Sequence, residues 1–171
     1  LIGLFLGIST GATVVVSQCF GAKDIQKLSK AIHVSIWLTA ANAIVFTILG
    51  LLISKWLLQI TDTPANIFEM ALTYSRIMFL CIPGLFFYNI LSGILRGMGD
   101  SVAPLIILIG ANILNAVFLY LFVVLFDRGI SGAAYATFLA QTLSAIVTLF
   151  YLLSSQKKYD INLRGLKPDW G

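Results

Sequence analysis

The sequence predicts an all-α protein, a polytopic membrane helix bundle with five transmembrane helices. Apolar residues make up 59% of the 171 residues and charged residues only 11%, whereas a soluble domain carries about a quarter charged residues. The apolar residues fall in five runs, and each run is long enough to cross about 30 Å of hydrocarbon as a helix. Composition and run length together therefore indicate helices that lie in lipid rather than in a soluble core.

The five runs give the predicted elements and their order. We place the spans at about residues 1–20, 31–54, 66–95, 102–126 and 129–155. Residues 1–156 then form one transmembrane lobe that we expect to be incomplete, and residues 157–171 form a basic linker toward a missing second lobe. The chain starts with LIGLFLG, without a Met or a basic leader region, so we expect it to be a fragment of a longer protein.

Polar segments separate the spans and carry helix-boundary signals. Residues 61–64, TDTP, offer Thr63 as an N-cap, with Pro64 at the first position of the third helix. The third span contains Pro83 followed by Gly84, which should kink or loosen it. Residues 127–132, DRGISG, form a short turn before the last span.

The segment before the fourth span, RGMGDSVAP at residues 96–104, is predicted to be a tight loop. Asp100 or Ser101 is expected to cap the next helix, and a proline lies early in that helix. The residues that we assign to this turn are Gly97, Gly99, Asp100 and Pro104.

The distribution of Lys and Arg predicts the orientation of the bundle. Residues 21–30, the 96–104 loop and the tail hold eight of these basic residues, against at most three on the opposite side. The positive-inside rule places the richer side in the cytoplasm. The tail is then cytoplasmic and the first residue lies outside, so at least one further helix is expected upstream. We expect an integral protein of the plasma (inner) membrane.

Small residues recur at helical spacing in two of the spans. Such stripes let another helix backbone approach closely, so we expect them to mark packing faces. The residues are Gly3, Gly7 and Gly11 in the first span, and Gly132, Ala136 and Ala140 in the last.

Polar side chains mark one face of each of the last three spans. Lipid offers an amide no hydrogen-bond partner, so these groups should face a neighbouring helix or a solvated cavity. Interhelical hydrogen bonding explains any one of them, but three such faces favour a shared cavity for an ion or a substrate. The predicted cavity residues are Asn89, Ser92, Asn112, Asn115, Thr137 and Gln141, with Ser144 and Thr148 continuing the last stripe.

The sequence shows no catalytic constellation, so we do not expect an enzyme. It has no Ser/His/Asp set, no metal-ligand cluster and no acidic residue deep within a span. Cys19 and Cys81 lie far apart in apolar sequence and are expected to be small buried residues. The net charge of +4 comes from short gaps between the spans, so no nucleic-acid partner and no cofactor are expected.

Four stretches resemble one lobe of the multidrug and toxic compound extrusion (MATE) family of transporters. They are GISTGATVVVSQCFGAKD at 7–24, ILRGMGDSVAPL at 94–105, LNAVF at 114–118 and GISGAAYATFLAQ at 129–141. The pattern is most similar to the amino-terminal lobe, which would make this chain helices two to six of a six-helix lobe. The resemblance implies a twelve-helix, two-lobe antiporter that exchanges drugs or organic cations for sodium ions or protons by alternating access.

The resemblance also implies roles for single residues. Asn89, Asn115 and Thr137 match polar members of an ion or proton site in this lobe of the family. Many relatives carry an Asp one turn after the helix-five Asn, but here that position is Leu119. A second acidic residue would lie in the first helix, which precedes this sequence, so the coupling ion stays open between sodium and proton.

The expected function is cation-coupled antiport that exports drugs or organic cations, with a small-molecule substrate, the lipid bilayer and a second lobe as partners. Two alternatives remain. A lipid-linked saccharide flippase of the same superfold would need charged residues in the cavity to bind a pyrophosphate. A non-transporting membrane scaffold would be consistent with Leu119 in place of the family Asp.

Overall fold

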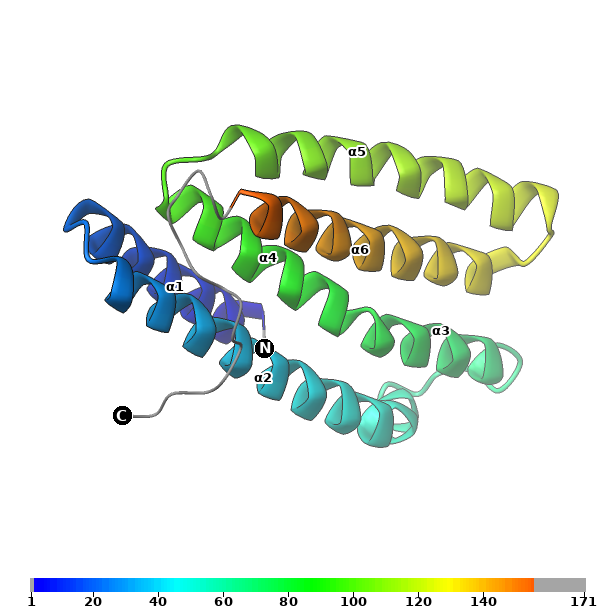
Figure 1. Cartoon of the computed structure of the whole chain (residues 1–171). Coiled ribbons are helices and arrows are strands. Elements are labelled where there is room, and N and C mark those ends of the chain that lie inside the picture. Colours follow the sequence, from blue (N-terminus) through cyan, green and yellow to red (C-terminus); the bar gives the residue numbers. More distant parts are fainter. Residues whose placement is uncertain (1, 156–171) are drawn as a thin grey trace.

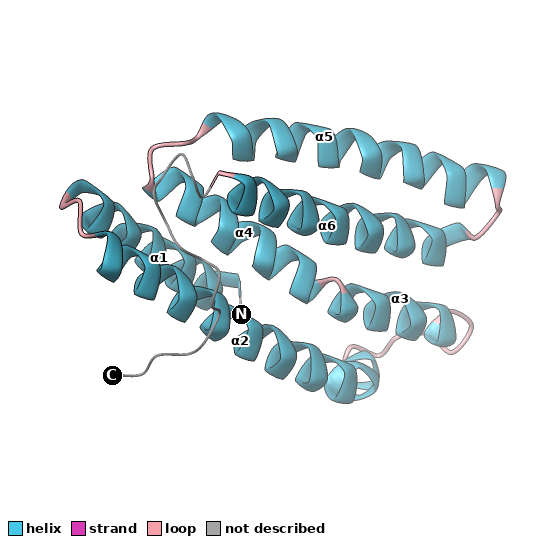
Figure 2. Ribbon diagram, viewed as in Figure 1, coloured by secondary structure: helices cyan, strands magenta, loops and turns pink. Residues whose placement is uncertain are grey.

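A computed structural model describes residues 2–155, and the side chains of residue 7 and residues 9–155. The described part is all helical, as predicted (Figure 1, Figure 2). The elements in chain order are α1 (Ile2–Gly21), α2 (Ile25–Ile60), α3 (Phe68–Leu80), α4 (Ile82–Gly97), α5 (Val102–Leu119), the π-helix η1 (Tyr120–Leu125) and α6 (Gly129–Ser154). The predicted linker at 157–171 lies outside the described residues.

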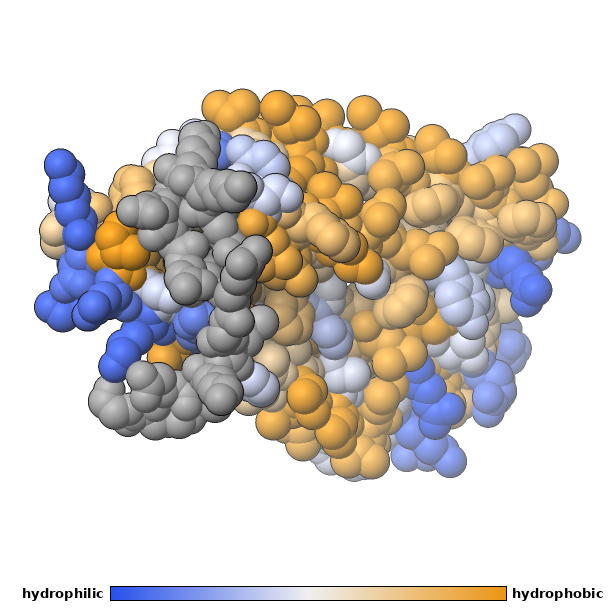
Figure 3. Space-filling view, in the orientation of Figure 1, coloured by the Kyte–Doolittle hydropathy of each residue, from blue (hydrophilic) through white to orange (hydrophobic). Residues whose placement is uncertain are grey.

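Within the described residues, four helical stretches are long and apolar enough to cross a membrane: Ile25–Ile60, Phe68–Gly97, Val102–Leu125 and Gly129–Ser154. The first predicted span corresponds to α1, a helix of 20 residues whose first side chains lie outside the described set. Figure 3 shows an apolar surface along the middle of the bundle, with hydrophilic residues gathered toward its two ends. This distribution is the one expected of a protein that lies in a bilayer.

The turns alternate between the two ends of the bundle. Figure 1 places the α1–α2 turn, the α4–α5 turn and the C-terminal end of α6 at one end, and the α2–α3 and η1–α6 connections at the other. The basic residues of the 21–30 and 96–104 segments thus lie at the same end, as the charge count requires. Asp24 begins α2 because its side chain accepts a hydrogen bond of 3.1 Å from the Lys27 backbone N–H.

The third predicted span breaks into two helices, α3 and α4, as Pro83 and Gly84 led us to expect. The break falls at Cys81, whose N–H bonds the carbonyls of Ile77 and Met78 at 3.1 Å. Pro83 then lies in the first turn of α4. A proline is tolerated there because the first N–H groups of a helix have no intrahelical acceptor.

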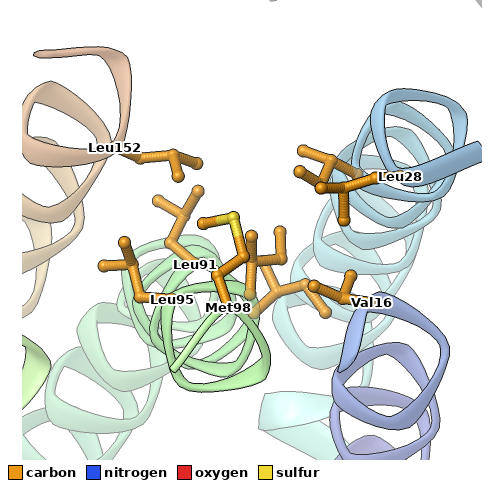
Figure 4. Close-up of a cluster of buried hydrophobic side chains, with 9 residues drawn as sticks. Val16, Leu28, Leu91, Leu95, Met98 and Leu152 are labelled. Carbon is orange, nitrogen blue, oxygen red and sulfur yellow. The ribbon is translucent and has the colours of Figure 1, made fainter. Parts of the chain in front are cut away.

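The apolar core surrounds α4. Leu91 and Leu95 of α4, and Met98 directly after it, lie among side chains from α1, α2 and α6 (Figure 4). Val16 and Leu28 are both fully buried on the far side of this cluster. The core therefore holds α4 in the middle of the bundle and fixes the position of its other face.

Of the two small-residue stripes predicted to pack against another helix, the one in α6 does so and the one in α1 does not within the described residues. Gly132 and Ala136 are buried, and a Cβ at Gly132 would lie 2.9 Å from the Phe122 carbonyl oxygen. Gly7 and Gly11 are exposed, and a Cβ on either would meet no atom of the described residues within 4 Å. The expected close packing through this α1 stripe is thus not seen in the described part, and the side chain position of Gly3 lies outside it.

The close contact between α1 and α4 is instead made by glycines of α4. A Cβ at Gly93 would lie 2.5 Å from the Thr13 hydroxyl, and one at Gly97 would lie 2.9 Å from the Thr13 carbonyl oxygen. Gly97 is the last residue of α4 rather than a loop residue. Its small size serves helix packing, because a larger residue would push against the α1 backbone.

Candidate functional site

A polar pocket of about 350 Å³ lies between α4, α5 and α6. All six residues that we predicted for a shared cavity line it: Asn89, Ser92, Asn112, Asn115, Thr137 and Gln141. The remaining lining residues are Leu85, Tyr88, Arg96, Leu108, Ala111, Ala140 and Ser144. Three successive helices thus direct their polar faces toward one space.

Close backbone contact sets the α4–α6 wall of the pocket. A Cβ at Gly84 would lie only 3.0 Å from the Gln141 carbonyl carbon and the Thr142 backbone nitrogen. The absence of a side chain at Gly84 lets the two helices approach beside Gln141. Sequence analysis assigned this glycine only to a kink, because spacing alone does not show which helix will cross it.

A capped turn positions α5 at the cytoplasmic end predicted by the charge count. Gly99 takes a φ of +88°, a conformation that favours glycine. One carboxylate oxygen of Asp100 accepts a hydrogen bond of 3.1 Å from the Ala103 N–H, and the other accepts one of 2.7 Å from the Tyr151 hydroxyl of α6. Asp100 therefore caps α5 and ties the turn to α6, whereas Ser101 provides no side-chain cap.

A second link joins α4 to the start of α5. The Tyr88 hydroxyl donates a hydrogen bond of 3.1 Å to the carbonyl oxygen of Pro104, and both residues are buried. Pro104 lies in the first turn of α5, as expected for a residue without an N–H. The pocket begins directly beside this link, because Tyr88 is one of its lining residues.

At the opposite end, the π-helix η1 continues α5 and packs on α6. The Arg128 N–H bonds the Phe122 carbonyl oxygen at 3.0 Å, and the same carbonyl lies over Gly132. Phe122 also has ring contacts with Phe118 and Phe126, at centroid distances of 6.4 Å and 5.9 Å. These contacts fix the depth of α5 against α6, and with it the height of Asn115 relative to Thr137.

Asn115 and Thr137 meet across the α5–α6 side of the pocket. The Asn115 amide nitrogen lies 3.5 Å from the Thr137 hydroxyl, at the long limit of a hydrogen bond. That hydroxyl donates to the Ala133 carbonyl oxygen at 3.1 Å, so its lone pairs remain available as acceptors. Amide and hydroxyl oxygens are ligands for hard cations such as sodium.

Other polar groups of the pocket differ in how far they are satisfied. The Asn89 amide nitrogen donates to the Leu85 carbonyl oxygen at 2.7 Å, and the Ser144 hydroxyl donates to the Gln141 carbonyl oxygen at 2.8 Å. The Ser92 hydroxyl is buried, with 2% of the residue exposed, and has no hydrogen-bond partner among the described residues. A buried polar atom without a partner calls for a water or a ligand.

The pocket carries one charged lining residue, Arg96, which sequence analysis had assigned to the loop after the third span. Arg96 lies inside α4, because the helix continues to Gly97 and so extends beyond the predicted end at residue 95. No Asp or Glu lines the pocket among the described residues.

Two further expectations concern acidic and metal-binding groups. Leu119, the position where many relatives carry Asp, is the last residue of α5, is 41% exposed and does not line the pocket. Among the described residues no group of three or more His, Cys, Asp or Glu side chains is arranged to hold a metal ion. Any ligands that this part of the chain offers to a cation in the pocket are neutral oxygens.

Comparison with known proteins places the chain in a family. The MatE family model matches residues 1–121. The chain is 35% identical over 153 residues to the "Probable multidrug resistance protein YpnP" of Bacillus subtilis (strain 168), covering 90% of this chain and 34% of that protein. It thus spans about a third of the length of this curated relative.

The fold matches solved transporters in two states. A structure described as the outward-facing conformation of a multidrug resistance MATE family transporter of the MOP superfamily matches with a TM-score of 0.88 at 26% identity. The inward-facing conformation described for such a transporter matches with a TM-score of 0.89 at 26% identity. The matches cover 99% of this chain and 38% or 39% of those chains. The chain therefore belongs to the MatE family, a family of membrane transporters rather than enzymes.

Proposed function

We propose that the chain forms part of one lobe of a cation-coupled antiporter that exports drugs or organic cations by alternating access. The observation that carries this proposal is the pocket, in which the six predicted polar side chains, from three membrane helices, line one space. Polar residues within membrane spans are costly and mark substrate or ion pathways. A volume of about 350 Å³ lies within the range of small-molecule sites.

The two structural matches support a lobe that moves as a unit. The chain fits an outward-facing and an inward-facing transporter with nearly equal TM-scores, 0.88 and 0.89. A lobe that deformed strongly between the two states would fit one of them distinctly better. The near equality favours a mechanism in which lobes rock against each other and carry the pocket with them.

Coupling is assigned to the Asn115–Thr137 side of the pocket. In this proposal the Thr137 hydroxyl oxygen and the Asn115 amide oxygen bind a sodium ion, or hold a water that passes a proton, and the Asn115 amide must turn because its nitrogen faces Thr137 in the described structure. A bound cation would replace the long direct contact of 3.5 Å and link α5 to α6 at this point. This coupling deepens the role that the family resemblance implies for the two residues. The protein would work in the plasma membrane, with the 157–171 segment in the cytoplasm.

A second candidate is a lipid-linked saccharide flippase, and one observation favours it. Arg96 lines the pocket, and a flippase needs a cationic group to bind a pyrophosphate. A single arginine among neutral amides would bind a doubly charged pyrophosphate only weakly, so the exporter remains our first choice.

The test uses the full-length parent protein in energised vesicles loaded with a cationic dye such as ethidium. We expect dye efflux that stops when one gradient, sodium or proton, is collapsed and continues when the other is collapsed. This outcome would establish an antiporter and name its ion. Efflux equal to that of protein-free vesicles under every gradient, with the protein folded and inserted, would reject the proposal.

A further inference from the structure

We propose that the Arg96 end of the pocket binds an anionic group, a carboxylate, sulfonate or phosphate, of the molecule that the protein transports. The inference rests on the proposed function, since it assigns a substrate class to the same pocket. It also departs from the organic cation that the family resemblance implies. Three observations carry it: the charge of the lining, the unpartnered Ser92 hydroxyl, and the separation of Arg96 from the Asn115–Thr137 contact.

The first observation is the charge of the lining. Arg96 is the one ionisable residue among the pocket residues that carries a full charge at neutral pH, because a guanidinium stays protonated in proteins. The ion pair found in the described part of the chain joins Lys27 to Asp24, at the start of α2 and outside the pocket. Among the described residues no Asp or Glu lines the pocket beside Arg96, which lies exposed at the end of α4.

The second observation is the buried hydroxyl of Ser92. Ser92 precedes Arg96 by four residues, so both lie on the same face of α4. Ser92 is a lining residue of the pocket, and its hydroxyl is buried and has no partner among the described residues. A hydroxyl next to a guanidinium can donate to the same anion, and hydrogen bonds to ionised groups are the strong ones. An anionic ligand would thus satisfy a group that the described chain leaves unsatisfied.

The third observation is that the pocket has two chemically distinct ends. Arg96 follows Asn89 by seven residues of α4, which corresponds to about 10 Å along the helix axis. Asn115 lies thirteen residues after Val102, the first residue of α5, so Asn115 and its partner Thr137 lie away from the turn that carries Asp100. An organic cation placed at the Arg96 end would meet a like charge, whereas a carboxylate there would form a charge-assisted, bidentate contact.

The test measures binding to the full-length protein in phosphatidylcholine vesicles with no imposed gradient. The probes are dansylglycine, which carries a carboxylate, and its uncharged methyl ester. The variants are Arg96→Gln, Arg96→Lys and Ser92→Ala, with Arg76→Gln as the control. Arg76 is a good match because it lies on α3 and does not line the pocket.

We expect the wild type to bind dansylglycine more tightly than the ester. Arg96→Gln should weaken dansylglycine binding by about tenfold or more and leave ester binding unchanged, since a charged hydrogen-bond partner is lost. Ser92→Ala should weaken it less, Arg96→Lys should retain most of the preference, and Arg76→Gln should match the wild type. Equal affinity of the wild type for both probes, or an unchanged preference in Arg96→Gln, would overturn the inference.

Two controls separate the possible sources of failure. Adding phosphatidylglycerol to the vesicles tests whether a lipid headgroup supplies the anion. If the site binds lipid headgroups, this lipid will compete with dansylglycine. If the site binds only soluble anions, dansylglycine binding will stay unchanged. Both results keep the anion site. Because binding is measured without a gradient, a carboxylate preference that depends on Arg96 would stand even if ethidium efflux failed. Efflux that succeeds while the preference is absent would reject only the anion site.

Discussion

Replacing Gly84 with leucine in the full-length protein is expected to prevent stable packing of α4 on α6. A Cβ at this position would already lie 3.0 Å from two backbone atoms of α6, at Gln141 and Thr142. Backbone cannot move aside as a side-chain tip can, so the helices must separate. Overpacking costs about 1–3 kcal/mol, and more where backbone must shift. We expect the larger cost here, and with it loss of the pocket wall beside Gln141.

The measurement is the unfolding temperature of the detergent-purified protein. Samples are heated to a series of temperatures, and size-exclusion chromatography measures how much folded protein remains after each. Gly110→Leu provides the matched control, because Gly110 lies within α5 and a Cβ there would meet no described atom within 4 Å. We expect Gly84→Leu to elute as aggregate or to unfold well below the wild type, and Gly110→Leu to stay near it. A Gly84→Leu protein as stable as the wild type would show that α4 and α6 do not cross as closely as described.

Removing the Asn115 amide is expected to uncouple transport from the ion gradient with little loss of stability. The Asn115–Thr137 hydrogen bond is long, at 3.5 Å, and interhelical hydrogen bonds within membranes contribute only about 0.6 kcal/mol on average. The hydrogen bond therefore contributes little to the stability of the fold. In the Asn115→Ala variant, however, the bound cation would lose one of its few neutral oxygen ligands. In Asn115→Ala, gradient-driven ethidium efflux should fall to the rate seen with the gradient collapsed.

Thr137→Val is the companion variant, since it removes the hydroxyl, the second proposed ligand, while keeping the shape of the side chain. Asn42→Ala serves as the control, because its amide bonds the Leu38 carbonyl oxygen on α2 and lies outside the pocket. We expect Asn42→Ala to transport as the wild type does. Undiminished gradient-dependent efflux in Asn115→Ala would remove Asn115 from the coupling site.

The polar pocket could be predicted from the sequence for a physical reason. Lipid leaves an amide without a partner, so polar side chains at helical spacing must turn toward the protein interior. Asn89 of α4, Asn115 of α5 and Gln141 of α6 followed this rule, and the three helices that carry them meet as expected. The break near Pro83 was predictable for a similarly local reason, because proline removes a backbone donor.

Features that depend on a partner element could not be predicted. The glycine stripe of α1 identified a face that another helix could approach, but spacing does not reveal whether one does. In the described structure Gly7 and Gly11 stay exposed, and Gly93 and Gly97 of α4 make the close contact with α1 instead. Gly93 and Gly97 have the same four-residue spacing in the sequence. The spacing alone does not show which helix will pack against them.

Two more features depended on where a helix ends or how it winds. Arg96 was assigned to a loop because the predicted span ended one residue before it, and a shift of two residues brings it into the pocket. The π-helix η1 has the same apolar composition as the end of a normal α-helix. Its Phe122 carbonyl lies close to Gly132 of α6, a contact between two helices that no local pattern encodes.

The central claim is that the space between α4, α5 and α6 is a wet pocket inside the membrane that holds the transported molecule. Cysteine accessibility tests it most directly in the full-length protein, after its native cysteines, Cys19 and Cys81 among them, have been replaced by alanine. Asn112→Cys places a thiol in the pocket, and Ile113→Cys places one at the same depth on the outer face, where Ile113 is 60% exposed. A charged maleimide reacts with the thiolate and so requires water at the site.

We predict that Asn112→Cys reacts with the maleimide, that Ile113→Cys stays unreactive in lipid, and that a transported compound slows the first reaction. If Asn112→Cys is as unreactive as Ile113→Cys, or if the transported compound leaves its rate unchanged, the pocket is not the transport cavity.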